Sequence, residues 1–269
     1  MARRARREAG ISSAAGLRRR PWLARLRRAL ALGDFVLHYQ PIVSLRDGRL
    51  SHYEALLRLA DGPGGKLVAP GRFLPAAEHY GLIGEIDRMV LGRVAALLGS
   101  SPGGDRGGPA PAVAVNVSAL SVTDPGMLEL LERGLSRHGA DPRRLVVEVT
   151  ETAAISDLEA AAAFCAGVRE LGCAVALDDF GAGFGSFQYL KHLPFDYLKI
   201  DGGFIRHLTA SHTDQLIVKA LVGVVHGMGR RTIAEFVGDA ATLSLLRDYG
   251  VDYAQGYEVG RPRPGAPAL

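Results

Sequence analysis

Short apolar runs alternate along the chain with longer segments in which apolar residues recur at helical spacing. The apolar runs predict strands over residues 35–43, 50–59, 112–117, 145–149, 174–177, 197–200, 232–234 and 253–254. The helical spacing predicts helices over residues 72–98 with a break near Gly81, then 125–138, 158–171, 187–192, 213–228 and 240–249. Strands that alternate with helices indicate parallel βα units. About eight strands in about 240 residues predict an α/β fold, a single TIM-like (β/α)8 barrel.

The first two predicted strands are joined differently from the others. Asp47 and Gly48 form a tight-turn signal between two apolar runs, with no helix between them. We therefore expect the barrel to contain one antiparallel strand, at this N-terminal hairpin.

Every predicted strand carries a polar or charged residue within its apolar run or close to its end. In chain order these residues are Gln40, Glu54 with Arg58, Asn116, Glu148, Asp178 with Asp179, Lys199 with Asp201, Glu235, and Gln255. The carboxyl ends of barrel strands converge on the face that holds the active site. One such residue would be an ordinary loop start, but the whole series predicts a site on that face.

The run LDDFGAGFGSF at residues 177–187 has three interpretations: a solvated turn, a phosphate-binding glycine loop, or half of a metal site. The spacing of Gly181, Gly183 and Gly185 matches neither a Walker nor a Rossmann fingerprint. The DFG triplet lacks the other protein-kinase motifs. The metal interpretation is therefore favoured, with the glycines forming a mobile loop over the ions.

The polar series consists largely of hard oxygen ligands: Glu54, Asn116, Glu148, Asp178 and Asp179. Converging carboxylates repel one another unless a cation lies between them. Oxygen ligands without His or Cys favour Mg²⁺ or Mn²⁺. Adjacent carboxylates suit two ions about 3.5–4 Å apart, with Asp178 as the bridge and Asp179 following the start of the turn. Lys199 would then orient an attacking water, and Glu235 would accept that water's proton or complete the second ion's ligand shell. Lys199 could instead form a purely structural ion pair.

Charge is distributed unevenly along the chain. Residues 1–30 contain ten arginines and one glutamate, whereas the whole chain carries a net charge of +4, which leaves −5 for residues 31–269. We expect a basic, disordered tail over residues 1–25, a barrel domain over 26–265 and a short C-terminal tail over 266–269. The acidic body argues against specific nucleic-acid binding by the barrel. The tail would be solvated or would weakly contact acidic lipid or RNA.

The two cysteines, Cys165 and Cys173, show neither metal-ligand nor redox spacing. They are expected to be buried, reduced thiols in a cytoplasmic protein. No apolar run approaches the roughly 20 residues that span a bilayer.

Taken together, the motifs of this chain resemble those of the EAL-domain cyclic-di-GMP phosphodiesterases. The motifs are QPIV at 40–43, YEALLRL at 53–59, NVS at 116–118, EVTET at 148–152, DDFGAGFGSF at 178–187, LKID at 198–201, AEFV at 234–237, QGY at 255–257 and GRP at 260–262. They occur in order over roughly residues 26–265, and such a long set is specific where any single motif would not be.

The resemblance implies Mg²⁺- or Mn²⁺-dependent hydrolysis of one phosphodiester of cyclic di-GMP to linear 5′-pGpG. It implies a first metal held by Glu54, Asn116, Glu148 and Asp178, and a second held by Asp178 and Asp179. It assigns the attacking water to Lys199 and Glu235, substrate contacts or site support to Gln40, Arg58, Asp201 and Gln255, and anchoring of the glycine-rich loop to Glu151. Family members also often dimerise, so a homodimer is expected.

Two departures from the family pattern bear on activity. The DDFGTGYSS pattern common in the family has lost three hydroxyl groups here, at Ala182, Phe184 and Gly185. The AEGVE-type segment reads AEFVG, so Gly238 replaces its second acid. These changes leave open a catalytically weak or inactive EAL-type receptor of cyclic di-GMP that acts through a protein partner. A third interpretation is another metal-dependent barrel enzyme, such as an enolase-like one.

Overall fold

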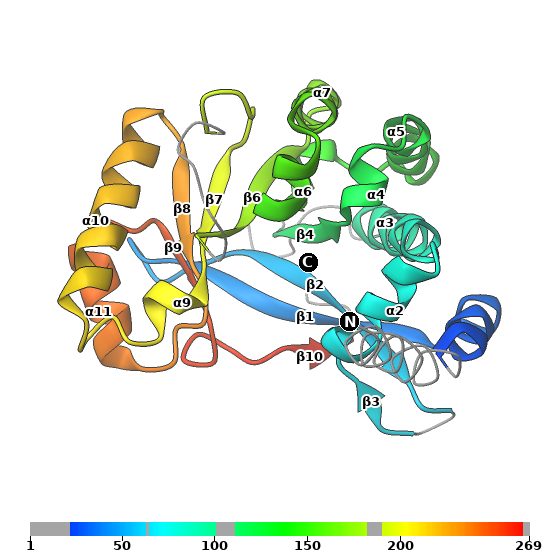
Figure 1. Ribbon diagram of the computed structural model, residues 1–269, viewed down its shortest axis with the longest axis horizontal. Coiled ribbons are helices and arrows are strands. Elements are labelled where there is room, and N and C mark those ends of the chain that lie inside the picture. Colours follow the sequence, from blue (N-terminus) through cyan, green and yellow to red (C-terminus); the bar gives the residue numbers. More distant parts are fainter. Residues whose placement is uncertain (1–21, 63–64, 101–110, 182–189, 266–269) are drawn as a thin grey trace, which may run out of the picture. The chain divides into compact units, whose positions relative to one another are not determined.

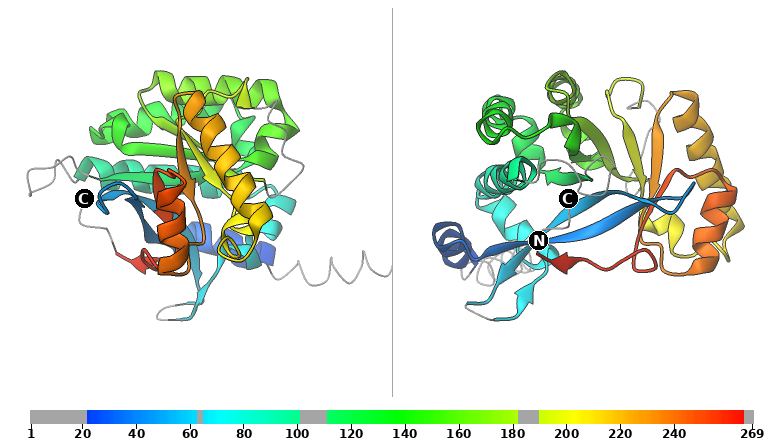
Figure 2. Two further views of the ribbon diagram at one scale, coloured as in Figure 1. Left: turned by 90° about the vertical axis from the view of Figure 1, so that its left-hand side faces the viewer. Right: turned by 180° about the vertical axis from the view of Figure 1, so that it is seen from behind.

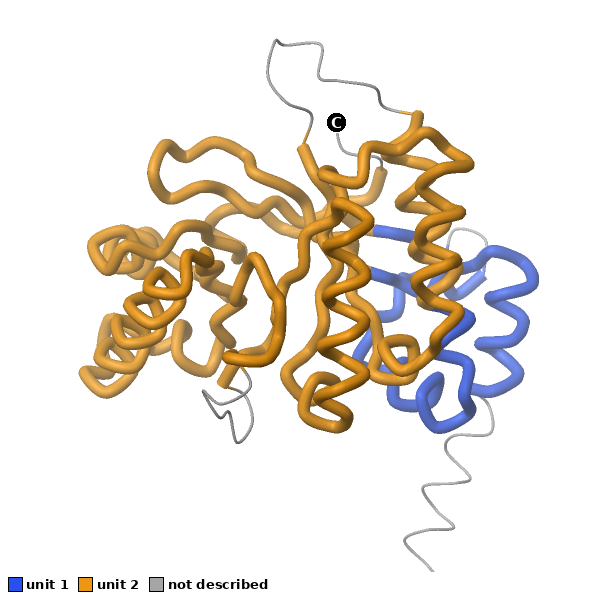
Figure 3. Tube along the Cα trace, turned by 90° about the horizontal axis from the view of Figure 1, so that it is seen from above, with its two compact units in different colours: residues 1–37, 57–86 blue, residues 38–56, 87–269 orange. Residues whose placement is uncertain are grey.

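The structure is a computed structural model that describes residues 22–62, 65–100, 111–181 and 190–265 (Figure 1). The chain divides into two compact units, residues 1–37 with 57–86 and residues 38–56 with 87–269, which Figure 3 colours separately. The second unit contains every candidate site residue except Arg58, so the site is described within that unit.

A closed ring of strands forms the barrel, and most of its residues belong to the second unit. Its strands are β1 (Phe35–Ser44), β2 (Leu50–Ala60), β4 (Ala112–Val117), β5 (Leu145–Thr150), β6 (Ala174–Phe180), β7 (Tyr197–Ile200), β8 (Arg231–Ala234) and β9 (Tyr253–Gln255). They are hydrogen-bonded in the order β1-β9-β8-β7-β6-β5-β4-β2, and the β1–β2 pairing closes the ring. β1 runs antiparallel to β9, whereas the pairs from β2–β4 round to β8–β9 are parallel. The predicted barrel with one antiparallel strand is confirmed.

The β1–β2 hairpin turns at the predicted position. Gly48 has a φ of 69°, in the left-handed region that glycine adopts without steric cost. Side chains alternate between the two faces of a strand, and this hairpin buries Gln40 and Ile42 of β1 and Glu54 of β2. One tight turn therefore places polar residues from two strands in the barrel.

Helices cover the outside of the ring, as the views in Figures 1 and 2 show. The longer ones are α3 (Ile83–Ser100), α5 (Gly126–His138), α7 (Leu158–Glu170), α10 (His212–Gly227) and α11 (Ala240–Asp248), and the short α4 (Ala119–Val122), α6 (Glu151–Ser156) and α9 (Gly202–Ile205) follow β4, β5 and β7. Local side-chain caps determine where several helices begin. Asp157 accepts a hydrogen bond from Ala160 N–H ahead of α7, and Asp239 accepts one from Thr242 N–H ahead of α11.

The main difference from the predicted elements concerns β6. The apolar run predicts a strand that ends at residue 177, but β6 continues to Phe180 and contains both Asp178 and Asp179. Several short elements were not predicted: the helices α4, α6 and α9, the helix over residues 22–32, and the strands β3 (Leu67–Val68) and β10 (Arg263–Pro264). The predicted helix over 187–192 falls partly outside the described residues.

The first unit contains a helix over residues 22–32, strand β3, a 3-10 turn at Pro70–Arg72 and helix α2 (Leu74–His79). Within it the buried rings of Phe35 and Phe73 lie 5.8 Å apart, and Arg25 forms an ion pair of 2.9 Å with Asp61. Helical structure thus begins ahead of residue 26, where the sequence predicted the barrel domain to start. The predicted C-terminal tail and most of the basic tail lie outside the described residues.

An aromatic layer fills the barrel at the amino-terminal ends of its parallel strands. The ring of Tyr197 lies 5.7 Å from that of His52 and 5.8 Å from that of Tyr253. Tyr253 also packs with Ile42 and Ile233. Burial lowers the pKa of His52 to about 4, so its imidazole is neutral at pH 7.

Cys165 and Cys173 are free and buried, which agrees with their predicted packing role. In the part of the chain that the structure describes, no helix has the length and apolar character needed to cross a bilayer.

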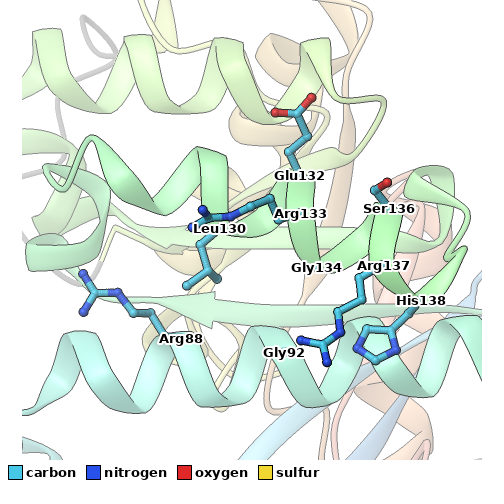
Figure 4. Close-up of a pocket in the computed structure, with 9 residues that line it drawn as sticks. All are labelled: Arg88, Gly92, Leu130, Glu132, Arg133, Gly134, Ser136, Arg137 and His138. Carbon is cyan, nitrogen blue, oxygen red and sulfur yellow. The ribbon is translucent and has the colours of Figure 1, made fainter.

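A groove of about 730 Å³ lies between α3 and α5, with Arg88, Arg133 and Arg137 among its lining residues (Figure 4). None of its described lining residues is a candidate site residue. Gly92 of α3 lines this groove, and a Cβ added there would meet no atom within 4 Å. Further along α3, a Cβ added to Gly99 would lie 2.1 Å from the His138 carbonyl oxygen. The two glycines of one helix therefore have opposite steric surroundings.

We predict that Gly99→Ala destabilises the protein by about 1–3 kcal/mol, because the backbone at the end of α5 must move to admit the methyl group. Gly92→Ala is the matched control and should stabilise by about 0.5–1 kcal/mol through helix propensity alone. Denaturant unfolding of both variants measures the difference. Equal stability of the two variants would contradict this account of α3 and α5 packing.

Candidate active site

The strand register brings the candidate residues to neighbouring positions at the carboxyl ends of the strands. Asn116 of β4 lies opposite Glu148 of β5, and Thr150 of β5 lies opposite Asp178 of β6. Asp178 therefore lies two residues closer than Glu148 to the end of the barrel that is formed by the carboxyl ends of the parallel strands. Polar side chains that are far apart in sequence become neighbours because the strands are parallel and in register.

Glu54 is held by amide groups from two other strands. Asn116 Nδ2 donates to Glu54 Oε1 over 2.7 Å, and Gln255 Nε2 donates to Glu54 Oε2. Gln255 Nε2 also lies 3.3 Å from Gln40 Oε1, and Gln40 Nε2 donates to the carbonyl of Gly260 over 3.0 Å. This network fixes the orientation of the Glu54 carboxylate without neutralising its charge.

Lys199 lies at the centre of a cluster of acidic side chains, called the acidic cluster below. Its side chain is 0% exposed, and its ammonium lies 2.9 Å from Glu148 Oε2 and 3.0 Å from both Asp178 Oδ1 and Glu235 Oε1. Glu54 Oε2 is also near, at 3.7 Å. One cation therefore contacts carboxylates from four other strands or strand ends, and its own pKa is raised well above its usual value although burial opposes this.

The negative charge of the cluster exceeds what one ammonium can balance. Burial, with neighbouring acids adding to it, raises the pKa of Glu148 well above its usual value and that of Glu235 to about 8. Burial also raises the pKa of Asp179 to about 6. Burial acts in the same direction on Glu54, but there Lys199 and the two amides outweigh it and lower the pKa. Further positive charge would let all these groups ionise together.

The cluster offers oxygen atoms that suit a hard divalent cation. Single oxygen atoms of Asp178, Asp179 and Glu235 all lie within 4.8 Å of one another. Glu148 Oε1 and Glu235 Oε2 are buried acceptors that receive no hydrogen bond within the described residues. Buried carboxylate oxygens need a donor or a cation, so these residues fit a metal with oxygen ligands.

A local irregularity in β6 brings the two adjacent aspartates to one side. In a regular strand, the side chains of Asp178 and Asp179 would point to opposite faces. Asp179 instead has a φ of 56°, and the pairing of β6 with β7 shifts register between Leu177 and Phe180. Both carboxylates therefore belong to the cluster. Asp179 was expected to reach it from a turn after the strand, but this residue is part of β6 itself.

Glu151 lies at the start of α6 and reaches the beginning of the glycine-rich segment. Its Oε2 accepts a hydrogen bond from Gly181 N–H over 2.9 Å, and Gly181 has a φ of 96°. The substituted positions Ala182, Phe184 and Gly185 lie outside the described residues. The contact is the one expected of a loop anchor, a role that stays a prediction.

Two further predicted substrate-binding residues form local contacts with backbone groups. Asp201 caps α9, where its Oδ1 accepts a hydrogen bond from Gly203 N–H over 2.8 Å. Arg58 belongs to the first unit, where its guanidinium donates to the carbonyl of Leu57 over 2.8 Å. Their substrate contacts stay predictions.

Sequence reasoning did not identify two residues beside the cluster. His52 belongs to the aromatic layer, where its ring lies 5.7 Å from that of Tyr197, and Phe236 directly follows Glu235 with a φ of 54°. The alternation along β2 could have placed His52 inside the barrel, because it lies two residues before Glu54. No sequence signal shows that a phenylalanine adopts a left-handed backbone.

Comparison with known proteins relates this geometry to a family. The family model for the EAL domain matches residues 23–262. The chain is 37% identical over 247 residues to a protein named cyclic di-GMP phosphodiesterase PdeB from Shewanella oneidensis, which covers 90% of this chain and 28% of that protein. It is 37% identical over 244 residues to the bifunctional diguanylate cyclase/cyclic di-GMP phosphodiesterase MucR from Pseudomonas aeruginosa, covering 91% of this chain and 35% of that protein. The chain thus spans about a third of the length of these curated relatives.

Solved structures match the fold over almost their whole length. A complex of the PaMucR phosphodiesterase with c-di-GMP aligns with a TM-score of 0.84 at 37% identity and covers 91% of this chain and 98% of that one. The FimX EAL domain from Pseudomonas aeruginosa bound to c-di-GMP aligns with a TM-score of 0.84 at 34% identity, covering 92% and 98%. From the match over residues 23–262 and these relatives, we conclude that the chain belongs to the EAL domain family.

Proposed function

We propose that this protein is a cyclic-di-GMP phosphodiesterase that hydrolyses one phosphodiester bond of its substrate to give 5′-pGpG. The observation that carries the proposal is the cluster around Lys199, in which buried carboxylates from separate strands surround a single ammonium. Relatives named as cyclic-di-GMP phosphodiesterases and the similarity to a c-di-GMP complex support the choice of substrate.

The acidic cluster would hold two Mg²⁺ or Mn²⁺ ions. Glu54, Asn116, Glu148 and Asp178 would ligate the first ion, and Asp178 with Asp179 the second. The unsatisfied Glu148 Oε1 and the proximity of Asp178 to Asp179 support this division. When bound, such a pair of ions polarises the phosphodiester and stabilises charge on the attacking and leaving oxygens.

The chain's own residues would handle the proton and the orientation of the reactants. Glu235 is the candidate base: its Oε2 is buried without a described partner, so this oxygen is available to take a proton from the attacking water. Lys199 holds the other oxygen of Glu235 at 3.0 Å and places positive charge beside the developing negative charge. Gln40, Arg58, Asp201 and Gln255 would contact the substrate, and Glu151 would anchor the loop that begins at Gly181.

A non-catalytic receptor of cyclic di-GMP is the second candidate function, and Gly238 is the observation that favours it. Gly238 stands where the AEGVE-type segment has its second acid, in the segment that follows Glu235. Incubation of the purified protein with cyclic di-GMP and Mn²⁺, followed by product analysis, separates the two functions. Formation of pGpG supports the enzyme, whereas binding without product selects the receptor.

A homodimer in the cytoplasm is part of the same proposal. The two free, buried thiols fit a reducing compartment. Light scattering coupled to size-exclusion chromatography would test the dimer.

We predict that the Asp178→Asn variant loses Mn²⁺ affinity by at least about tenfold, because the shared ligand would offer one charged oxygen fewer to each ion. Asp248→Asn removes an equal charge from an exposed position at the end of α11 and should retain wild-type affinity. Isothermal titration calorimetry with Mn²⁺ measures both. Unchanged Mn²⁺ binding in Asp178→Asn would remove the metal assignment, and the same experiment with Glu54→Ala tests the first ion's ligands.

We predict that Glu235→Gln lowers kcat by about 10²–10⁴-fold while KM changes little, because the amide keeps the shape but cannot accept the proton. Glu258→Gln is the matched control at an exposed position and should behave as the wild type. Steady-state hydrolysis of cyclic di-GMP gives both constants. A comparable change in kcat and KM for Glu235→Gln would indicate a structural role instead.

We predict that Gly238→Glu raises the turnover of cyclic di-GMP, because it restores the missing acid. A Cβ at this position would meet only the Phe236 carbonyl oxygen, at 3.9 Å, and the backbone there is outside the left-handed region, so a side chain fits. Gly238→Ala controls for the loss of glycine's flexibility and should leave turnover near the wild-type rate. Equal activity of the two variants would show that the second acid contributes nothing in this chain.

A further inference from the structure

Another cavity lies against the outer face of the β1–β2 hairpin. It has a volume of about 380 Å³, and its lining includes Tyr39 of β1, Tyr53 of β2 and residues from the segment 259–265. Gln40 and Glu54, which directly follow these tyrosines, are buried inside the barrel, so the alternation of side chains turns both tyrosines outward. The cavity is therefore separate from the acidic cluster, and its volume lies within the roughly 300–1,000 Å³ of small-molecule sites.

Contacts within the second unit hold the walls of this cavity in place. β10 pairs with β1, and Arg263 lies directly opposite Tyr39, so the two side chains are neighbours on one face of the pair. The carbonyl of Gly260 accepts a hydrogen bond from Gln40 Nε2 over 3.0 Å. A Cβ added to Gly260 would lie 2.5 Å from Pro41 Cγ, so this segment packs closely on β1. The walls are thus formed by the fold itself, as is usual for small-molecule sites.

The charge on the walls of the cavity is positive. None of its described lining residues is acidic, and the lining includes the exposed side chains of Arg261 and Arg263. Neither arginine takes part in an ion pair with a carboxylate of the described residues. The guanidinium carbon of Arg261 lies 4.2 Å from the centroid of the Tyr257 ring, which restrains this group without using an acceptor. Guanidinium groups bind phosphate through paired N–H donors, so this part of the cavity suits a phosphate.

The groove between α3 and α5 shows that arginines alone do not provide such a site. There Arg88 and Arg133 each form an ion pair with a carboxylate, and Glu132 also lines the groove. Much of the positive charge of that groove is therefore compensated within the protein. The cavity on the hairpin has no such compensation among its described lining residues, and an anionic ligand would supply it.

The two tyrosines add an aromatic lining to this positive charge. The side chains of Tyr39 and Tyr53 are both half-buried, so each ring is partly packed on the protein and partly accessible. Aromatic side chains stack with nucleobases whatever the identity of the base, because every base has a π-face. Rings beside uncompensated guanidinium groups can therefore bind a base and the phosphate attached to it.

We infer that this cavity is a second ligand site, which binds a nucleoside monophosphate with its base against the two tyrosines and its phosphate at Arg261 and Arg263. The site goes beyond the proposed function, because none of its lining residues contributes a side chain to the acidic cluster. Neither guanidinium alone nor an aromatic ring alone would select this ligand. The two halves of the ligand therefore have to be tested separately.

The first test measures the binding of adenosine 5′-monophosphate (AMP) by calorimetry in EDTA, which removes metal-dependent binding at the acidic cluster. The double variant Arg261→Gln with Arg263→Gln should raise the Kd at least about tenfold, because the phosphate loses both charged donors. Arg27→Gln with Arg28→Gln is the matched control. It removes the same charge from exposed positions of the helix over residues 22–32 and should retain the wild-type Kd.

The second test separates the ring from the charge. Tyr39→Leu should raise the Kd of AMP about tenfold, whereas Tyr39→Phe keeps the ring and should bind as the wild type does. Adenosine and inorganic phosphate each carry one half of the ligand and should bind the wild type at least about tenfold more weakly than AMP.

Three outcomes would overturn the inference. They are an unchanged Kd in the Arg261→Gln, Arg263→Gln variant, inorganic phosphate that binds as tightly as AMP, and no binding of AMP to the wild type at millimolar concentration. Turnover of cyclic di-GMP does not enter any of these measurements. Failure of the second site would therefore leave the proposed function unaffected, and the absence of pGpG would leave the second site unaffected.

Discussion

The buried ammonium of Lys199 is the interaction on which the rest of the site depends. A lysine that is 0% exposed is costly to keep charged unless carboxylates surround it, and Glu148, Asp178 and Glu235 do so at 2.9–3.0 Å. The same carboxylates would repel one another without it. The ammonium and the carboxylates thus offset the free-energy cost of burying each other. The net charge of the cluster is still negative, so it can bind further cations. The structural and functional interpretations of Lys199 are therefore compatible.

Much of this arrangement could be predicted from the sequence, because it follows from strand ends. Glu148 and Lys199 each lie within a short apolar run between helical segments, and a parallel barrel brings such positions together whatever the details of packing. The closed ring and the antiparallel β1 followed from the same pattern and from the turn at Gly48. The family resemblance added the substrate and the division of roles, which the pattern alone does not contain.

What could not be predicted depends on backbone geometry rather than on residue type. A strand that contains two charges resembles the start of a loop, so β6 was predicted to end before Asp178. Its irregularity and the φ of 56° at Asp179 are set by the pairing with β7, which no local propensity encodes. The left-handed φ of Phe236 was unforeseen for the same reason, since the ring of Phe236 lies against Gly202, a residue of a different element.

The link between Glu54 and Gln255 has a consequence for how the protein is made. These two residues are 201 positions apart and lie on β2 and β9, near the two ends of the barrel sequence. On the ribosome, β2 is synthesised long before β9. Gln255, the amide partner of Glu54, is therefore absent until nearly the whole domain has been made. The complete site therefore forms only after synthesis of the domain is finished. A nascent chain lacks it even when its early βα units have already folded.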